Sequence, residues 1–156
     1  MTRPCRPQPG VRILAAALGV ALLPMTFLQP VRVSGRSMEP ALADGSICLA
    51  LRPWCAGRPS RGQVWVLDTP AGLSVKRLVG LPGERLELRA GRTLVNGGAL
   101  PEAYATLQDA LQEGGWEAGP GYFFLGDNRN ASRDSRAWGA RPAGALRGLV
   151  LGTLYY

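Results

Sequence analysis

Histidine is absent from this 156-residue sequence, and cysteine occurs only three times, without a C-x-x-C spacing. The imidazole that most often activates a serine hydroxyl or binds a catalytic metal is therefore missing. Zinc sites built from cysteine and histidine are excluded for the same reason. We expect no metal and no cofactor, and any general base near neutral pH must come from another residue type.

Lysine is almost as scarce, because Lys76 is the only one and the other basic residues are arginines. A guanidinium stays charged in proteins, but a desolvated ammonium can lose its proton. Val75 and the Leu78-Val79 pair provide apolar surroundings. Burial there would lower the pKa of Lys76 from about 10.4 to roughly 8, at a cost of about 3 kcal/mol. Lys76 is therefore the strongest candidate for a general base; the alternative is an exposed strand residue beside Arg77.

The formal net charge is +7, but the arginines are scattered from Arg3 to Arg147 rather than clustered. No basic segment interleaved with aromatic residues is present, which argues against nucleic-acid binding. The length is enough for one domain plus a short appendage. We expect a monomer with a single independently folding domain.

The N-terminus has the layout of a membrane-directed segment. Arg3, Arg6 and Arg12 precede an uncharged, mainly apolar run from Ile13 to Leu28. No small-x-small triplet ends this run, which favours a retained signal anchor over a removable signal peptide. The positive-inside rule then places the N-terminus in the cytoplasm by a small margin. We therefore expect a single-pass protein of the cell (inner) membrane with a cytoplasmic segment (1–12), a transmembrane segment (13–30) and an extracytoplasmic domain (31–156). A buried core helix is the alternative for the apolar run.

The three cysteines fall on both sides of the expected membrane segment. Cys5 would be cytoplasmic, whereas Cys48 and Cys55 would lie outside, where disulfides can form. We hypothesise a Cys48–Cys55 bridge.

The pattern after residue 30 is that of a mainly β domain. Short apolar or alternating runs are separated by Gly, Pro, Asp and Asn, as expected of strands and turns. Arg89-Ala90-Gly91-Arg92 is typical of a hairpin connection. One short helical insertion is expected over 101–113, which begins with Pro101 and is followed by Gly114-Gly115. The expected strands are 47–51, 63–67, 73–81, 86–88, 93–95, 122–125 and 146–154.

A serine follows a glycine turn in Ser34-Gly35-Arg36-Ser37. Such a turn can expose the hydroxyl and aim nearby backbone N–H groups at one point, as an acyl-transfer nucleophile and its oxyanion hole require. An ordinary turn serine is the alternative, because this pattern alone is common.

The segment from Gly126 to Arg136 is dense in hydrogen-bonding groups. A calcium loop is excluded, because Arg129 occupies a ligand slot and no bidentate glutamate closes the loop. Asp134 and Arg136 can brace this loop by charge-assisted hydrogen bonds and present Ser132 or Ser135 to a buried partner.

Together these blocks resemble bacterial type I signal peptidases, membrane-anchored serine–lysine endopeptidases that remove signal peptides from exported proteins. The resemblance implies that Ser37 is the nucleophile, that Lys76 is the general base and that Ser132 helps to orient the lysine amine. It also implies that Asp134 and Arg136 form a structural salt bridge of the site loop. The matching blocks, in chain order, are the N-terminal anchor, Ser34-Gly35-Arg36-Ser37-Met38-Glu39-Pro40, Arg61-Gly62-Gln63-Val64-Trp65-Val66, Val75-Lys76-Arg77-Leu78-Val79-Gly80-Leu81-Pro82-Gly83-Glu84, and Gly126 to Arg136 followed by Trp138-Gly139.

The same resemblance implies a reaction through an acyl-enzyme and cleavage after a small-x-small site. The expected partners are signal peptides of exported precursors, bound extended against a strand edge, and membrane lipid. Gly35 stands where some family members carry a hydroxyl residue as a second oxyanion donor, so the source of that donor is left open.

Three other readings compete with this one. A self-cleaving repressor with serine–lysine chemistry would need a DNA-binding domain before Ser34, where the chain is apolar instead. A maturation or conjugation-type peptidase of the same clan would act on fewer substrates. A non-enzymatic, membrane-anchored β domain would have no need of an intact Ser37, Lys76 and Ser132.

Overall fold

The computed structural model describes residues 26–106 and 113–155, and this part of the chain is mainly β. One short α-helix, α2 (Ser135–Trp138), and two 3-10 turns, η1 (Pro53–Cys55) and η2 (Ala143–Ala145), accompany the strands. The expected mainly β class is confirmed, but the short α-helix is α2 and not the insertion expected over 101–113. The strands are β1 (Leu28–Arg32), β2 (Ile47–Leu51), β3 (Val64–Thr69), β4 (Gly72–Gly80), β5 (Arg85–Arg89), β6 (Arg92–Val95), β7 (Gly98–Ala99), β8 (Gly114–Glu117), β9 (Phe123–Leu125) and β10 (Leu146–Tyr155).

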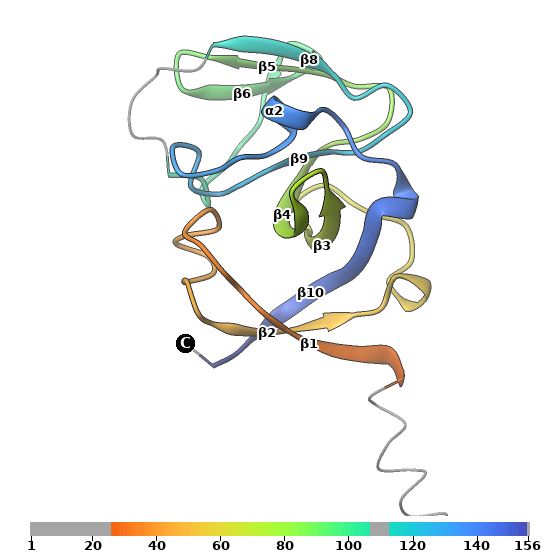
Figure 1. Cartoon of the computed structure of the whole chain (residues 1–156). Helices are drawn as coiled ribbons and strands as arrows, with labels where there is room; N and C mark the ends of the chain where they lie inside the picture. The colour runs from red at the N-terminus through yellow and green to blue at the C-terminus, as the bar shows by residue number, and fades with distance from the viewer. Residues whose placement is uncertain (1–25, 107–112, 156) are drawn as a thin grey trace, which may run out of the picture.

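The strands form two antiparallel sheets. The larger has six strands in the order β1-β2-β10-β3-β4-β9, and the smaller has four in the order β7-β6-β5-β8. Figure 1 shows the smaller sheet at one end of the molecule and β1, β2 and β10 at the other, with β3, β4 and β9 between them. The middle strands therefore form the support for the side chains that β4 carries.

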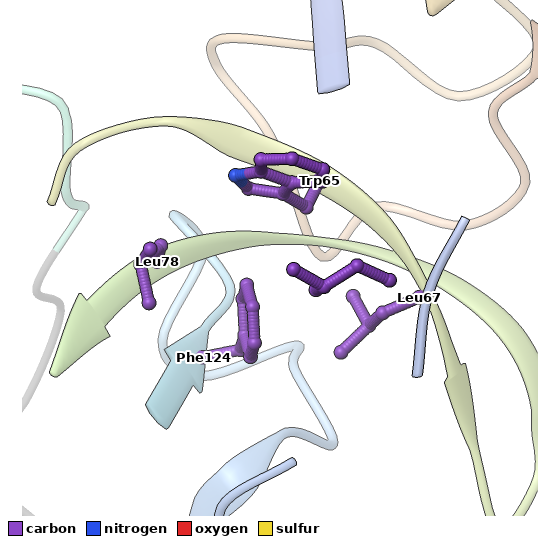
Figure 2. Close-up of a cluster of buried hydrophobic side chains, with 5 residues drawn as sticks. Trp65, Leu67, Leu78 and Phe124 are labelled. Atoms are coloured by element: carbon purple, nitrogen blue, oxygen red, sulfur yellow. The ribbon is translucent and has the colours of Figure 1, made fainter. Parts of the chain in front are cut away.

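A cluster of buried apolar side chains fixes the middle strands (Figure 2). Trp65 and Leu67 are two positions apart on β3, so both point to one face of the sheet, where they meet Leu78 from β4 and Phe124 from β9. Leu67, Leu78 and Phe124 are fully buried. Burying each such side chain contributes about 2 kcal/mol, so this packing makes β4 a rigid support.

The strand boundaries agree with the sequence pattern to within a residue or two, but β1, β7 and β8 were not predicted. β1 corrects the boundary of the expected transmembrane segment, because Leu28–Pro30 pair with Leu49–Leu51 of β2. The sequence pattern assigns these three residues to the anchor because Leu28 ends the apolar run and Gln29-Pro30 closes it. Residues 13–25 lie outside the described part of the chain. Within the described ranges, no helix has the length and apolar character needed to cross a membrane.

The predicted helix over 101–113 is wrong in its described part. Residues 101–106 form a turn and an isolated bridge between Thr106 and Asn128, while residues 107–112 lie outside the description. Gly114 and the residues after it belong to β8 rather than to a helix end. The Tyr104 ring instead lies 4.1 Å below the Arg77 guanidinium, so a tertiary contact takes the place of a helical face.

The predicted hairpin is confirmed, with Arg89 paired to Arg92 across the β5–β6 turn and positive φ angles at Ala90 and Gly91. The proposed Cys48–Cys55 disulfide is wrong, because both thiols are free. Cys48 is buried in the core, whereas Cys55 is exposed on η1, so the two side chains point into different surroundings.

Candidate active site

Ser37 lies in a loop that is held by a buried apolar cluster. Its neighbour Met38 is fully buried with Val33, Leu42 and Cys48. The Ser37 carbonyl accepts a hydrogen bond of 3.0 Å from the Asn128 backbone N–H. This contact joins the serine loop to the polar segment that begins at Gly126.

Gly35 gives the serine loop its shape. Its φ angle of +90° lies in the region that favours glycine, and its N–H donates to Asp44 Oδ1 at 2.8 Å. This residue therefore offers no side-chain hydroxyl near the site, and its backbone donor is already used.

Lys76 comes from β4 and reaches the serine. Its side chain is buried, with a relative exposure of 3%, and Nζ lies 2.8 Å from Ser37 Oγ. Nζ also donates to Ser74 Oγ at 2.9 Å and to the Val75 carbonyl at 2.8 Å. The two residues expected to form the catalytic pair are thus brought together from positions 39 apart in the chain.

The surroundings of Lys76 favour a neutral amine. Desolvation by burial lowers the pKa of Lys76 to about 8, while the charges of Asp134 and Asp127 oppose that shift. The value agrees with the one expected from the sequence. An amine with this pKa is substantially unprotonated in mildly basic solution, so it can accept a proton from a hydroxyl.

Asp134 and Arg136 form the ion pair that the sequence suggested. Arg136 Nε lies 2.7 Å from Asp134 Oδ1, and both side chains are almost fully buried. Asp134 also caps α2 by accepting from the Arg136 N–H, and it accepts from the Gly126 N–H at 3.0 Å. The pair therefore ties the start of the polar segment to its end.

Ser132 does not make the predicted contact with the lysine amine. Its Oγ is buried and has no hydrogen-bond partner among the described residues. The hydroxyl lies over Gly126, where an added Cβ would overlap with it and would sit 2.5 Å from the Ser37 carbonyl oxygen. Ser132 thus packs beneath the serine loop. Besides the Ser37 hydroxyl, the hydroxyl that contacts the Lys76 amine is that of Ser74.

Sequence reasoning missed Ser74 and a second buried ion pair. A signal for Ser74 was present, because residues two apart on an expected strand share a face. Arg77 and Asp127 pair in a bidentate manner at 2.6 and 2.8 Å. No local pattern could have joined them, since they are 50 positions apart.

A cavity of about 930 Å³ opens beside the serine and the lysine. Strand β4 pairs with β9 only from Arg77 onward, so its stretch from Leu73 to Lys76 has a free edge facing this cavity. Within the described ranges, including this cavity, no three His, Cys, Asp or Glu side chains are close enough together to bind a metal ion. The lining residues include Pro30, Val31, Val33, Ser34, Ser37, Met38, Arg52, Trp54, Val66, Asp68, Leu73, Ser74, Val75, Lys76, Leu146 and Arg147.

Comparison with known proteins identifies the family. The family model described as signal peptidase, peptidase S26, matches residues 8–155. A signal peptidase I from Bacillus amyloliquefaciens is 35% identical over 136 residues, which cover 80% of this chain and 73% of the relative. A signal peptidase I from Leptolyngbya laminosa is 30% identical over 146 residues, covering 85% and 72%.

A solved structure agrees with these relatives. The crystal structure of a signal peptidase I from Enterococcus faecalis matches with a TM-score of 0.50 and 30% identity, covering 59% of this chain and 96% of that one. The fold and the family model together define a peptidase. The chain belongs to the signal peptidase family, peptidase S26.

Proposed function

We propose that this chain is a serine–lysine endopeptidase that cleaves signal peptides from exported precursor proteins. The observation that carries the proposal is the distance of 2.8 Å between Lys76 Nζ and Ser37 Oγ, at a lysine with 3% exposure. The relatives named signal peptidase I support the choice of substrate.

In the proposed reaction, the neutral Lys76 amine accepts the Ser37 proton while Ser37 Oγ attacks the scissile carbonyl. The resulting ammonium gives this proton to the departing amine of the mature protein, which leaves an ester between Ser37 and the signal peptide. Lys76, neutral again, takes a proton from a water whose oxygen attacks the ester carbonyl. The ammonium then protonates Ser37 Oγ as its bond to the acyl group breaks, and the signal peptide leaves with a new carboxyl group. A base with a pKa of about 8 suits both proton transfers.

The oxyanion of the tetrahedral intermediate needs donors beside Ser37. We assign the first to the Ser37 backbone N–H, as the glycine turn suggests. Gly35 supplies no hydroxyl, and its own N–H donates to Asp44. The role of the Asp134–Arg136 pair is to hold the loop against which Ser37 rests.

The substrate would bind extended in the cavity, adding main-chain hydrogen bonds to the free edge of β4 between Leu73 and Lys76. Alternate side chains of an extended peptide point the same way. The two small residues of a small-x-small site, two positions apart in the substrate, would therefore enter two pockets on the same side. Signal peptides are embedded in membranes, and we propose that the apolar run before Leu28 anchors the enzyme there. The N-terminus would then be cytoplasmic and the catalytic domain extracytoplasmic.

The test is cleavage of a secretory precursor by the purified full chain in detergent, across a pH series. We expect Ser37→Ala and Lys76→Arg to lose cleavage, because arginine cannot act as a neutral base. The parent's kcat should rise with pH, with a midpoint near pH 8, as the Lys76 amine loses its proton. Ser60→Ala, an exposed serine away from the cavity, is the matched control and should cleave like the parent.

Retained cleavage in Lys76→Arg would refute the lysine base. If the parent leaves ordinary secretory precursors intact, the narrower maturation or conjugation-type peptidase becomes the better account. Labelling of Ser37 by an acylating serine reagent separates that enzyme from a non-enzymatic β domain, which should remain unlabelled.

A further inference from the structure

The Lys76 amine has three oxygen neighbours at hydrogen-bond distance: Ser37 Oγ at 2.8 Å, Ser74 Oγ at 2.9 Å and the Val75 carbonyl at 2.8 Å. A carbonyl can only accept, so the Val75 oxygen takes one N–H of the amine in either protonation state. A hydroxyl can accept or donate. The direction in which the nitrogen lone pair points therefore depends on what occupies the Ser74 position.

The position of Ser74 is well fixed. Ser74 and Lys76 are two positions apart on β4, and strand geometry places both side chains on one face. Ser74 is paired to Leu67, and Lys76 to Trp65, in the register of β3. Since Leu67 and Trp65 are buried in the core, the hydroxyl and the amine are carried by the same rigid pair of strands.

We propose that Ser74 is the positioning residue for the Lys76 amine, a role that rests on the proposed peptidase function. A neutral amine has two N–H groups and one lone pair. When Ser74 Oγ and the Val75 carbonyl each accept one N–H, the lone pair is left facing Ser37 Oγ. The Ser37 O–H bond then breaks as the third N–H bond forms, and the resulting ammonium keeps both acceptors.

Ser132 does not supply this contact. Its Oγ has no partner among the described residues and lies over Gly126. The contrast between the two serines separates this proposal from the role that resemblance alone gives to Ser132.

The experiment compares Ser74→Ala, Ser74→Thr and Ser132→Ala in the full chain in detergent, with Ser60→Ala as the control. Because Lys76 is the only lysine, protein labelled with ¹³Cε-lysine should give one side-chain NMR signal whose titration reports the pKa of this amine directly. The pH dependence of kcat and KM for precursor cleavage is measured in parallel.

For Ser74→Ala we expect kcat to fall on the order of 10-fold, the loss typical of one hydrogen bond to a charged group, with KM little changed. The ammonium form loses an acceptor, so the pH at which kcat rises and the pKa from the NMR titration should both be lower. Ser74→Thr keeps the hydroxyl and suits a strand, so it should recover most of kcat and the parent titration. Ser132→Ala should lose less activity than Ser74→Ala and should not move the lysine titration.

An active parent with an unmoved titration in Ser74→Ala would overturn this inference alone. So would a Ser132→Ala variant that shifts the lysine signal more than Ser74→Ala does. An inactive parent would overturn the proposed function and, with it, the catalytic role of Ser74. Because the NMR titration needs no substrate, it would show whether Ser74 affects the pKa of the Lys76 amine even when the parent is inactive.

Discussion

Lys76 Nζ and Ser37 Oγ lie 2.8 Å apart although 39 positions separate them in the chain. Lys76 is carried by β4, which is packed into the larger sheet, and Ser37 precedes Met38, which is fully buried in a separate cluster. The geometry of the pair therefore depends on two supports that meet through the polar segment after Gly126. Changes to either support should alter activity in predictable ways.

The lysine should leave a signature in the pH dependence of stability. Its pKa of about 8 in the folded state lies below the ordinary value of about 10.4 expected when unfolded. Between these values the unfolded chain binds more protons, so the stability of the parent rises with pH, by about 1.4 kcal/mol per unit. Below pH 8 both states are protonated, and the full cost of the buried ammonium is present.

Lys76→Met lacks this ionisation, so its stability relative to the parent should fall as pH rises from 8 to 10. Urea unfolding at several pH values measures the difference. Arg85→Met is the control, because an exposed guanidinium stays charged throughout this window and its difference should be flat. A flat difference for Lys76→Met as well would show that the folded pKa is not depressed.

Gly126→Ala should disturb the serine loop more than it disturbs the fold. A Cβ there would overlap with Ser132 Oγ and would lie 2.5 Å from the Ser37 carbonyl oxygen. Overpacking of this kind costs about 1–3 kcal/mol of stability. A displacement of Ser37 by about 1 Å can cost about 100-fold in rate.

The measurements are kcat for precursor cleavage and the urea midpoint. Gly152→Ala is the matched control, since a Cβ at Gly152 meets nothing within 4 Å. Equal activity in both variants would mean that the close approach at Gly126 does not position Ser37.

Asp134→Asn should move the rise of activity with pH, which follows deprotonation of Lys76, to lower pH. The Asp134 carboxylate raises the pKa of Lys76, so its removal favours the neutral amine. Because the Asp134–Arg136 pair is buried, breaking it should also cost about 3 kcal/mol of stability.

The pH profile of kcat/KM, taken at a temperature where circular dichroism shows the variant folded, measures the shift. Glu84→Gln is the control, since it removes an equal charge from a pair with Arg61 that does not act on Lys76. A rise that moves equally in both variants would point to net charge rather than to Asp134.

The mainly β class and most strands followed from sequence, because alternating apolar residues and turn residues are local signals. β1 did not, since the expected anchor extends to residue 30 and only pairing with β2 makes Leu28–Arg32 a strand. The helix over 101–113 failed for a related reason, as the Tyr104 ring packs against the Arg77 guanidinium from a distant strand. The Cys48–Cys55 bridge failed because chain proximity says nothing of which side chain turns inward.

The sequence by itself determined which residue could serve as the base, because a chain without histidine and with one lysine offers only Lys76 for a base of this kind. It also determined that Asp134 and Arg136, two positions apart, could pair. Only the tertiary structure decided that Ser74 rather than Ser132 meets the amine. The reason is that burial and the direction of a hydrogen bond are set by packing between distant segments, and the pKa of Lys76 depends on both.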